Sequence, residues 1–82
     1  MAPDLEIYQP SKNIMTSETD IEVIGKTEPG SELSINEEAV LTDNEGNFVK
    51  LINLKKGLNT LEISVKKKYS RVNTVIKQVL VE

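Results

Sequence analysis

Apolar residues recur at every second position in three separate stretches of the chain, with polar residues between them. The clearest stretches are residues 21–23, 33–35 and 61–65. Side chains two positions apart on a strand share a face, so this alternation predicts sheets with one buried and one solvated face. The stretches are separated by residues that favour turns, namely Pro29, Gly30, Gly46 and Gly57. The pattern therefore predicts an all-β domain.

The spacing of these stretches and turns predicts about seven strands. We expect them at residues 5–8, 20–26, 32–36, 39–41, 48–54, 59–65 and 71–81. The first strand stops at Pro10, because proline has no N–H to donate to a sheet ladder. Residues 13–15 can resume pairing after this break, on the opposite sheet. The whole order predicts an antiparallel β-sandwich of the immunoglobulin-like type.

The alternation also predicts which side chains form the core. The expected inward residues are Ile21, Val23, Leu33, Ile35, Phe48, Ile52, Leu54, Leu61, Ile63, Val65, Val75, Val79 and Val81. Five large apolar residues fall on the outer faces in the same registers, namely Val49, Leu51, Leu58, Ile76 and Leu80. If they are exposed, they form apolar surface that a partner could cover. A β-bulge near Val49 and Leu51 would instead turn these two inward.

Four residues are expected to shape the turns. Pro29 presets a φ of about −65° at the second position of a turn, and Gly30 accepts the positive φ of the third position. Gly46 is expected at positive φ in the hairpin turn 43–47, which leads into the next strand. Gly57 marks a further turn before the strand that begins at residue 59. These turns would set the registers of the strands that they join.

Asn59 is a polar residue on the otherwise apolar face shared by Leu61, Ile63 and Val65. One interpretation of Asn59 is a ligand contact. The interpretation that we favour is that its amide bonds the backbone of the turn 55–58 and holds the corner where the chain enters the strand. Replacing Asn59 with leucine should then lower stability without changing any binding.

The composition narrows the class of protein. A length of 82 residues predicts a single domain, residues 1–82, near the lower limit for a core without disulfides or metal. The formal net charge of −3 argues against nucleic acid as a partner. No stretch approaches the length of a membrane helix, and an apolar signal segment is missing. We expect a module of a larger multidomain protein that inserts in no membrane and is a monomer in isolation.

Catalysis by this domain is not expected. The sequence has neither histidine nor cysteine, so the commonest general bases and the thiol nucleophile are absent. Glu37 and Glu38 are adjacent on a turn and do not face each other across a cleft. A sandwich of this size also offers little concavity from which to exclude water. We therefore expect a non-enzymatic domain without a cofactor.

The segment that begins at Asp43 is rich in oxygen-bearing side chains, as calcium loops are. An EF-hand needs Asp or Asn at its third and fifth positions and Gly at its sixth, whereas here Glu45 is third and Gly46 fourth. A hairpin turn explains the segment without metal. Calcium takes six to eight oxygen ligands, so a site would need Glu37 or Glu38 to join Asp43. The weak calcium candidates are thus Asp43, Glu45, Glu37 and Glu38.

Two further groups have both a functional and a structural interpretation. Tyr8 and Tyr69 would suit stacking on a sugar ring, but only if the fold brings them together. Each is more simply a rim residue, with its ring on the core edge and its hydroxyl in water. The basic residues between 66 and 71 would suit a phosphate, but a solvated turn between two strands is the simpler interpretation in an acidic domain.

The spacing of several of these residues resembles that of bacterial immunoglobulin-like domains, from about Leu5 to the end of the chain. The motifs are Ile21-x-Val23-x-Gly25-x-Thr27-x-Pro29-Gly30-Ser31, Leu33-x-Ile35-Asn36, Asp43-x-x-Gly46-x-Phe48 and Leu54-x-x-Gly57-x-Asn59-x-Leu61-x-Ile63-x-Val65. Similar domains lie beside glucodextranase catalytic domains and in arrays on bacterial surface proteins. The chain departs from this family at Asn36-Glu37, where Asn-Gly is common, and at residues 67–70, where the family has a Gly-Asn turn.

The resemblance implies an accessory module of an extracellular or cell-surface bacterial protein, with neighbouring domains of the same chain as its partners. Two roles stay open. A structural spacer predicts a polar surface, no deep pocket, and termini at opposite ends of the sandwich. An adhesion module that binds glycan or protein predicts an exposed apolar patch or an open sheet edge, such as the first strand that Pro10 interrupts.

Overall fold

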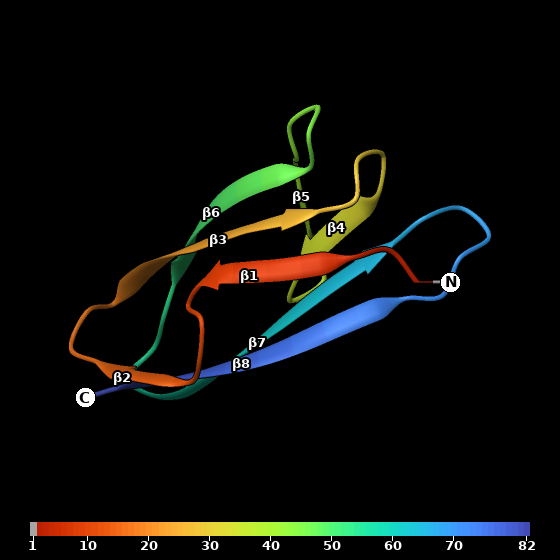
Figure 1. Ribbon diagram of the computed structural model, residues 1–82. Helices are drawn as coiled ribbons and strands as arrows, with labels where there is room; N and C mark the ends of the chain where they lie inside the picture. Colours follow the sequence, from red (N-terminus) through yellow and green to blue (C-terminus); the bar gives the residue numbers. More distant parts are fainter. Residues whose placement is uncertain (1) are drawn as a thin grey trace.

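The computed structural model describes residues 2–82, which form two β-sheets packed face to face (Figure 1). The strands are β1 (Leu5–Gln9), β2 (Ile14–Thr16), β3 (Asp20–Thr27), β4 (Glu32–Ile35), β5 (Glu38–Val40), β6 (Asn47–Asn53), β7 (Gly57–Lys66) and β8 (Asn73–Val81). Across these described residues there is no helix. The predicted all-β sandwich is confirmed, and its eighth strand is β2, the segment that follows the break at Pro10.

The strands divide into a three-stranded sheet, β1-β3-β6, and a five-stranded sheet, β2-β8-β7-β4-β5. All the pairs are antiparallel except β2–β8, which is parallel. The parallel pair arises because the chain leaves the first sheet at the end of β1 and continues in the same general direction on the second sheet. The order of both sheets is consistent with an immunoglobulin-like sandwich, in which strands A, B and E face strands G, F and C.

The core lies between the two sheets and consists of aliphatic side chains and one aromatic ring. Its buried residues are Val23, Leu33, Ile35, Val40, Phe48, Leu54, Leu61, Ile63, Val65, Val79 and Val81. Three expected core residues, Ile21, Ile52 and Val75, are only half-buried. Ile21 and Ile52 are cross-strand partners near one end of the three-stranded sheet, beyond the point where β1 stops, so β1 does not cover them.

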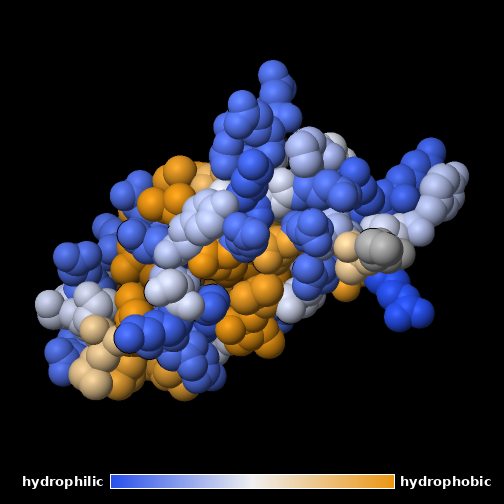
Figure 2. Space-filling model, viewed as in Figure 1, coloured by the Kyte–Doolittle hydropathy of each residue, from blue (hydrophilic) through white to orange (hydrophobic). Residues whose placement is uncertain are grey.

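The five aliphatic residues expected on outer faces are all exposed. Their exposed fractions are Val49 58%, Leu51 62%, Leu58 64%, Ile76 57% and Leu80 39%. The bulge considered for the strand around Val49 is absent, because β6 pairs with β3 in unbroken register from Asn47 to Asn53. The irregularity lies instead in β1, between Ile7 and Gln9. On the face seen in Figure 2, apolar surface is visible between the hydrophilic side chains.

Backbone geometry at the turns explains several residue choices. Gly30 has a φ of 81°, and the Ser31 N–H donates to the Glu28 carbonyl across the turn at 3.2 Å. Gly46 has a φ of 90° and lies against the Thr27 carbonyl, so that a Cβ at this position would collide with the backbone. The strand that begins just after Gly46 can therefore approach β3 only with glycine at this turn.

The hairpin between β4 and β5 has a two-residue loop. Both loop residues have positive φ, 50° at Asn36 and 68° at Glu37. This is the pattern of a type I′ turn, whose second position favours glycine. The predicted tight turn is present, and the departure from Asn-Gly places a glutamate in a conformation that L-residues rarely adopt.

The sandwich is elongated, with Cα dimensions of 40 × 21 × 19 Å. The beginning and the end of the described chain lie near opposite ends of this long axis (Figure 1). The start of the described chain lies at the start of β8, because the Asn73 side chain donates to the Pro3 carbonyl at 2.9 Å. Glu82 follows the other end of β8. A strand of nine residues spans roughly 30 Å, so the two ends are well separated.

Candidate functional site

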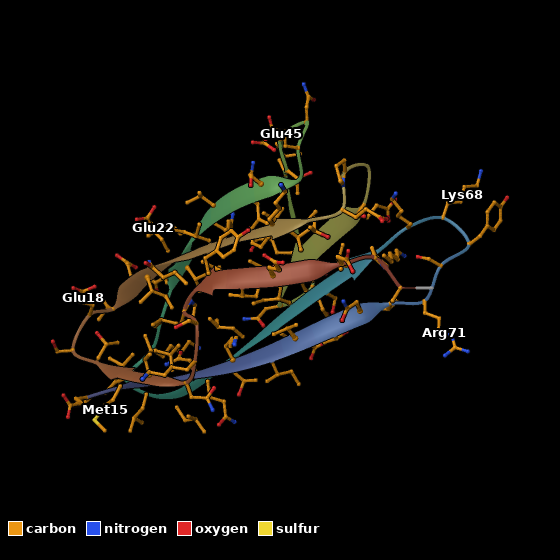
Figure 3. The ribbon with its side chains drawn as sticks, viewed as in Figure 1. Met15, Glu18, Glu22, Glu45, Lys68 and Arg71 are labelled. Atoms are coloured by element: carbon orange, nitrogen blue, oxygen red, sulfur yellow. The ribbon has the colours of Figure 1, made fainter. Side chains whose placement is uncertain are left out.

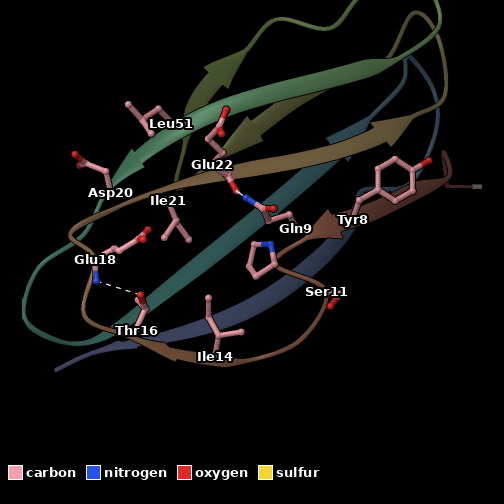
Figure 4. A pocket seen from close by; sticks show the side chains of 11 residues that line it. Tyr8, Gln9, Ser11, Ile14, Thr16, Glu18, Asp20, Ile21, Glu22 and Leu51 are labelled. Carbon is pink, nitrogen blue, oxygen red and sulfur yellow. Dashed lines mark hydrogen bonds between the residues drawn. The ribbon is translucent and has the colours of Figure 1, made fainter.

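A hollow of about 790 Å³ opens between the sheets where β1 gives way to β2 (Figure 4). Its floor is apolar, since the ring of the buried Pro10 and the side chains of Ile14 and Ile21 line it. Its rim is acidic and polar, and the remaining lining residues are Tyr8, Gln9, Ser11, Thr16, Glu18, Asp20, Glu22 and Leu51. The hollow exists because β1 ends before it covers Ile21.

Several polar groups around this hollow are occupied by the fold itself. The Gln9 amide donates to the Glu22 carbonyl at 3.1 Å, and the Glu18 N–H donates to Thr16 Oγ1 at 3.1 Å. The Asp20 carboxylate accepts a 2.8 Å bond from the Asn53 amide. These bonds hold the strand ends and leave few preset donors directed at a ligand.

The two tyrosines occupy different places. Tyr8 lines the hollow and is 52% exposed, and a hydrogen bond with Glu6, then partial burial and the charge of Glu6, raise the pKa of its phenol. Tyr69 is 96% exposed in the loop between β7 and β8, where Lys68 Nζ lies 5.3 Å from its ring centroid. The expectation that its ring covers the core edge is wrong, because nearly all of the side chain is exposed to solvent.

The basic residues between 66 and 71 lie in or beside this same loop, at one end of the molecule (Figure 3). Lys67 Nζ lies 2.8 Å from Glu28 Oε2, and Lys66 Nζ lies 3.9 Å from Glu32 Oε2. Acidic side chains of the Pro29-Gly30 turn region thus compensate part of the positive charge. The cluster is a solvated turn, as the sequence predicted, and two of its basic side chains, Lys66 and Lys67, are paired with glutamates.

The carboxylate of Asp43 is directed at its own loop. Asp43 Oδ1 accepts hydrogen bonds from the backbone N–H groups of Asn47 at 2.8 Å and Glu45 at 2.9 Å. Hydrogen bonding, chiefly from Asn47, holds the pKa of Asp43 below its ordinary value of 3.8. Glu38, another of the calcium candidates, lies 3.4 Å from Lys50. Within residues 2–82 no group of three or more acidic side chains is arranged to hold a metal ion.

The amide of Asn59 bonds the corner that leads into β7. Its Nδ2 donates to the carbonyls of Lys55 at 2.8 Å, Gly57 at 3.1 Å and Val79 at 3.3 Å. Its Oδ1 accepts the Lys55 N–H at 3.0 Å. The side chain therefore uses both its donor and its acceptor atoms on the backbone, and the stabilising role that we assign to it stays a prediction.

Two residues make structural contacts that the sequence pattern did not predict. Thr27 is buried, and its hydroxyl donates to the Asp4 carbonyl at 2.7 Å. Asn36 Oδ1 accepts the Glu62 N–H at 2.8 Å, while the Asn36 N–H donates to the Glu62 carbonyl at 2.9 Å. The available signals were the position of Thr27 at the end of an alternating stretch and the tolerance of asparagine for positive φ.

Five of the exposed apolar residues form two groups on different sheets. On the five-stranded sheet, Met15, Leu80 and Leu58 are consecutive cross-strand neighbours on the outer face of β2, β8 and β7. On the three-stranded sheet, Val49 and Leu51 lie on the outer face of its edge strand β6. No helix of the described chain is both long and apolar enough to cross a membrane.

The fold and these sites define a small all-β sandwich whose polar side chains serve mainly to hold its turns. No protein-family model matches the chain. It is similar to amylopullulanase from Thermoanaerobacter thermohydrosulfuricus, with 32% identity over 77 residues. This similarity covers 92% of the chain but only 5% of that enzyme. The chain thus spans about a twentieth of the length of the curated relative it matches, and an all-β segment of this kind fits an accessory domain of a carbohydrate-active enzyme.

Proposed function

We propose that the chain is a non-catalytic, immunoglobulin-like spacer module of a secreted or cell-surface bacterial glycoside hydrolase. One observation carries the proposal: nearly the whole chain aligns with a small share of a far longer enzyme. A segment that corresponds to one complete sandwich has the size of a separate accessory domain. The role is assigned by this similarity together with the features of the domain, because the fold alone serves many functions.

The shape of the domain supports a spacing role. The two ends of the chain lie near opposite ends of a body 40 Å long (Figure 1). A domain with this arrangement separates whatever is attached to its two ends by its own length. An ordered sandwich also holds that distance more narrowly than a flexible linker of the same number of residues.

The side chains support a non-catalytic role. Histidine and cysteine are missing from the sequence, and the carboxylates of Asp20 and Asp43 accept hydrogen bonds from neighbouring strands or loops. Glycoside hydrolysis uses a pair of carboxyl groups on either side of a bound sugar, separated by about 5–10 Å. Glu18 and Glu22 are on the rim of the hollow between β1 and β2, but the apolar floor of that hollow offers no donors for sugar hydroxyls.

A distance measurement tests the spacer directly. The chain has no native cysteine, so Ala2→Cys and Glu82→Cys accept dyes at its two ends alone. Single-molecule energy transfer should give one narrow distance, comparable with the 40 Å long axis. The same labelled chain in denaturant is the control and should give a broad distribution. A short distance, or a broad one under native conditions, would contradict the proposal.

A second candidate function is an accessory module that binds glycan or protein. The hollow beside Tyr8 and the exposed aliphatic residues favour it. An amide NMR titration with maltoheptaose, pullulan fragments and calcium separates the two functions. The spacer predicts a spectrum that does not move, whereas localised shifts at Tyr8 and residues 18–22, or at residues 43–47 with calcium, would replace it with the binding module.

A further inference from the structure

The edge strands of the two sheets differ in how well they are protected from pairing with another chain. β1 is irregular near Tyr8 and is followed by Pro10, while β2 and β5 have only three residues each. Short edges, bulges and prolines are the usual protections of sheet edges. β6 has seven residues in regular register and neither a bulge nor a proline. It is the longest open edge of the described chain.

The hydrogen bonds at both ends of the β3–β6 ladder show which backbone groups of β6 are free. The Thr27 N–H donates to the Gly46 carbonyl, and the Leu54 N–H donates to the Thr19 carbonyl, each across a directly opposed pair. Antiparallel pairs alternate between bonded and non-bonded positions. The even-numbered residues of β6 therefore bond β3, and the N–H and C=O groups of Val49, Leu51 and Asn53 point away from it.

Asn47 confirms this alternation independently. Its N–H and C=O are both bonded to Asp43, in the loop on the side away from β3. Beyond Asn47, the described chain places no strand beside this edge, since β6 pairs with β3 alone. Val49 and Leu51 thus combine outward backbone groups with exposed aliphatic side chains.

The sequence of β6 is self-complementary about its middle residue. In the order Asn47-Phe48-Val49-Lys50-Leu51-Ile52-Asn53, each residue has a counterpart of the same kind at equal distance from Lys50. In an isologous dimer each position meets its counterpart across the two-fold axis, so here apolar residues meet apolar residues and asparagine meets asparagine. Antiparallel pairing centred on Lys50 places each odd-numbered residue of one strand opposite an odd-numbered residue of the other. The backbone N–H and C=O groups of β6 that point away from β3 then face those of the second copy.

We propose that β6 pairs antiparallel with β6 of a second copy of this chain, centred on Lys50. The two three-stranded sheets then become one six-stranded sheet. Val49 of each copy lies opposite Leu51 of the other in a bonded pair, and these four side chains pack together on the outer face. This arrangement satisfies the free backbone groups of Val49 and Leu51 and covers their apolar side chains at the same time.

Lys50 decides whether this pairing is tolerated. An inward-pointing lysine on an edge strand ordinarily discourages pairing, because two lysines would meet at the two-fold axis. Here Lys50 Nζ lies 3.4 Å from Glu38 Oε1, so each copy brings a compensating carboxylate. The centre of the dimer holds two positive and two negative charges. Glu38→Gln should therefore weaken the pairing.

Sedimentation equilibrium of the 82-residue chain tests the proposal. An interface this small should dissociate in the range of about 0.1–1 mM. Val49→Pro removes an outward N–H without touching the ladder to β3, and it should weaken self-association at least about tenfold. Leu58→Thr is the matched control, because it removes a similarly exposed aliphatic side chain from the other sheet and should leave self-association unchanged.

Amide hydrogen exchange gives a second readout that needs no variant. The Val49 and Leu51 amides should exchange more slowly at 1 mM than at about 10 µM protein, whereas the Phe48 amide, already bonded to β3, should not change. A chain that stays monomeric at 1 mM would overturn the proposal. So would self-association that survives Val49→Pro, or that Leu58→Thr abolishes instead, which would assign the contact to the Met15–Leu80–Leu58 row.

Discussion

β7 and β6 are both rich in apolar residues, but the fold uses the two strands differently. β7 lies inside the five-stranded sheet between β8 and β4, and its inner residues Leu61, Ile63 and Val65 are at most 1% exposed. β6 lies at the edge of the three-stranded sheet, and it is apolar on both faces. The middle residue of its inner face is Lys50, whose side chain is 34% exposed.

The difference shows what a neighbour on each side contributes. A central strand has its backbone bonded on both sides, so its inner face is enclosed along its whole length and its outer face can be polar. An edge strand is enclosed on one side only, and the inner positions of β6 become more exposed from Phe48 toward Ile52. The inner residue Ile52 of β6 is therefore only half-buried, whereas the inner residues of β7 belong to the core.

The largest expected effect separates the two strands by burial. Ile63→Ala in β7 should lower the free energy of unfolding by about 2–5 kcal/mol, because a fully buried side chain leaves a cavity. Leu51→Ala in β6 should change it by less than about 0.5 kcal/mol, since that side chain is 62% exposed. Urea unfolding at low protein concentration measures both. Equal losses would mean that β6 is as enclosed as β7.

An intermediate effect separates two asparagines at the strand ends. Asn59→Ala should cost about 1–3 kcal/mol, because the substitution removes the bonds of its amide to three carbonyls and to the Lys55 N–H. Asn53→Ala in β6 is the matched control and should cost less than about 0.5 kcal/mol, since it removes a single exposed bond to Asp20. Unfolding of both variants in urea checks the difference, and retained stability in Asn59→Ala would rule out its anchoring role.

The smallest expected effect depends on pH and concerns the turns that lead into the two strands. Asp43 holds the turn before β6, and its pKa is lowered by folding, so its contribution is present above pH 3.8 and is lost as the pH falls through the lower folded value. Asn59, which holds the corner before β7, does not titrate. Asp43→Asn should therefore flatten the acid limb of the stability curve slightly.

Urea unfolding between pH 7 and pH 2 measures this difference. The stability lost in Asn59→Ala should be the same at every pH, which provides the control for general acid effects. Identical pH profiles for the wild-type chain and Asp43→Asn would show that the carboxylate of Asp43 has the same pKa in the folded and unfolded chains.

The sequence by itself determined the class of fold, most of the core and the positions of the turns. These follow from local rules: the period of two separates the faces of Leu61, Ile63 and Val65 from those of their neighbours, and Gly30 and Gly46 mark positions of positive φ. The outward direction of Val49 and Leu51 also followed from the alternation.

Only the tertiary structure decided which strands are central and which are edges. That assignment depends on pairing between distant segments, such as the parallel contact of β2 with β8 and the early end of β1 that exposes Ile21. It also decided that Asn59 reaches the carbonyl of Val79 and that Thr27 bonds Asp4. Periodicity specifies the face on which a side chain lies, whereas the enclosure of that face depends on the neighbours that the whole fold supplies.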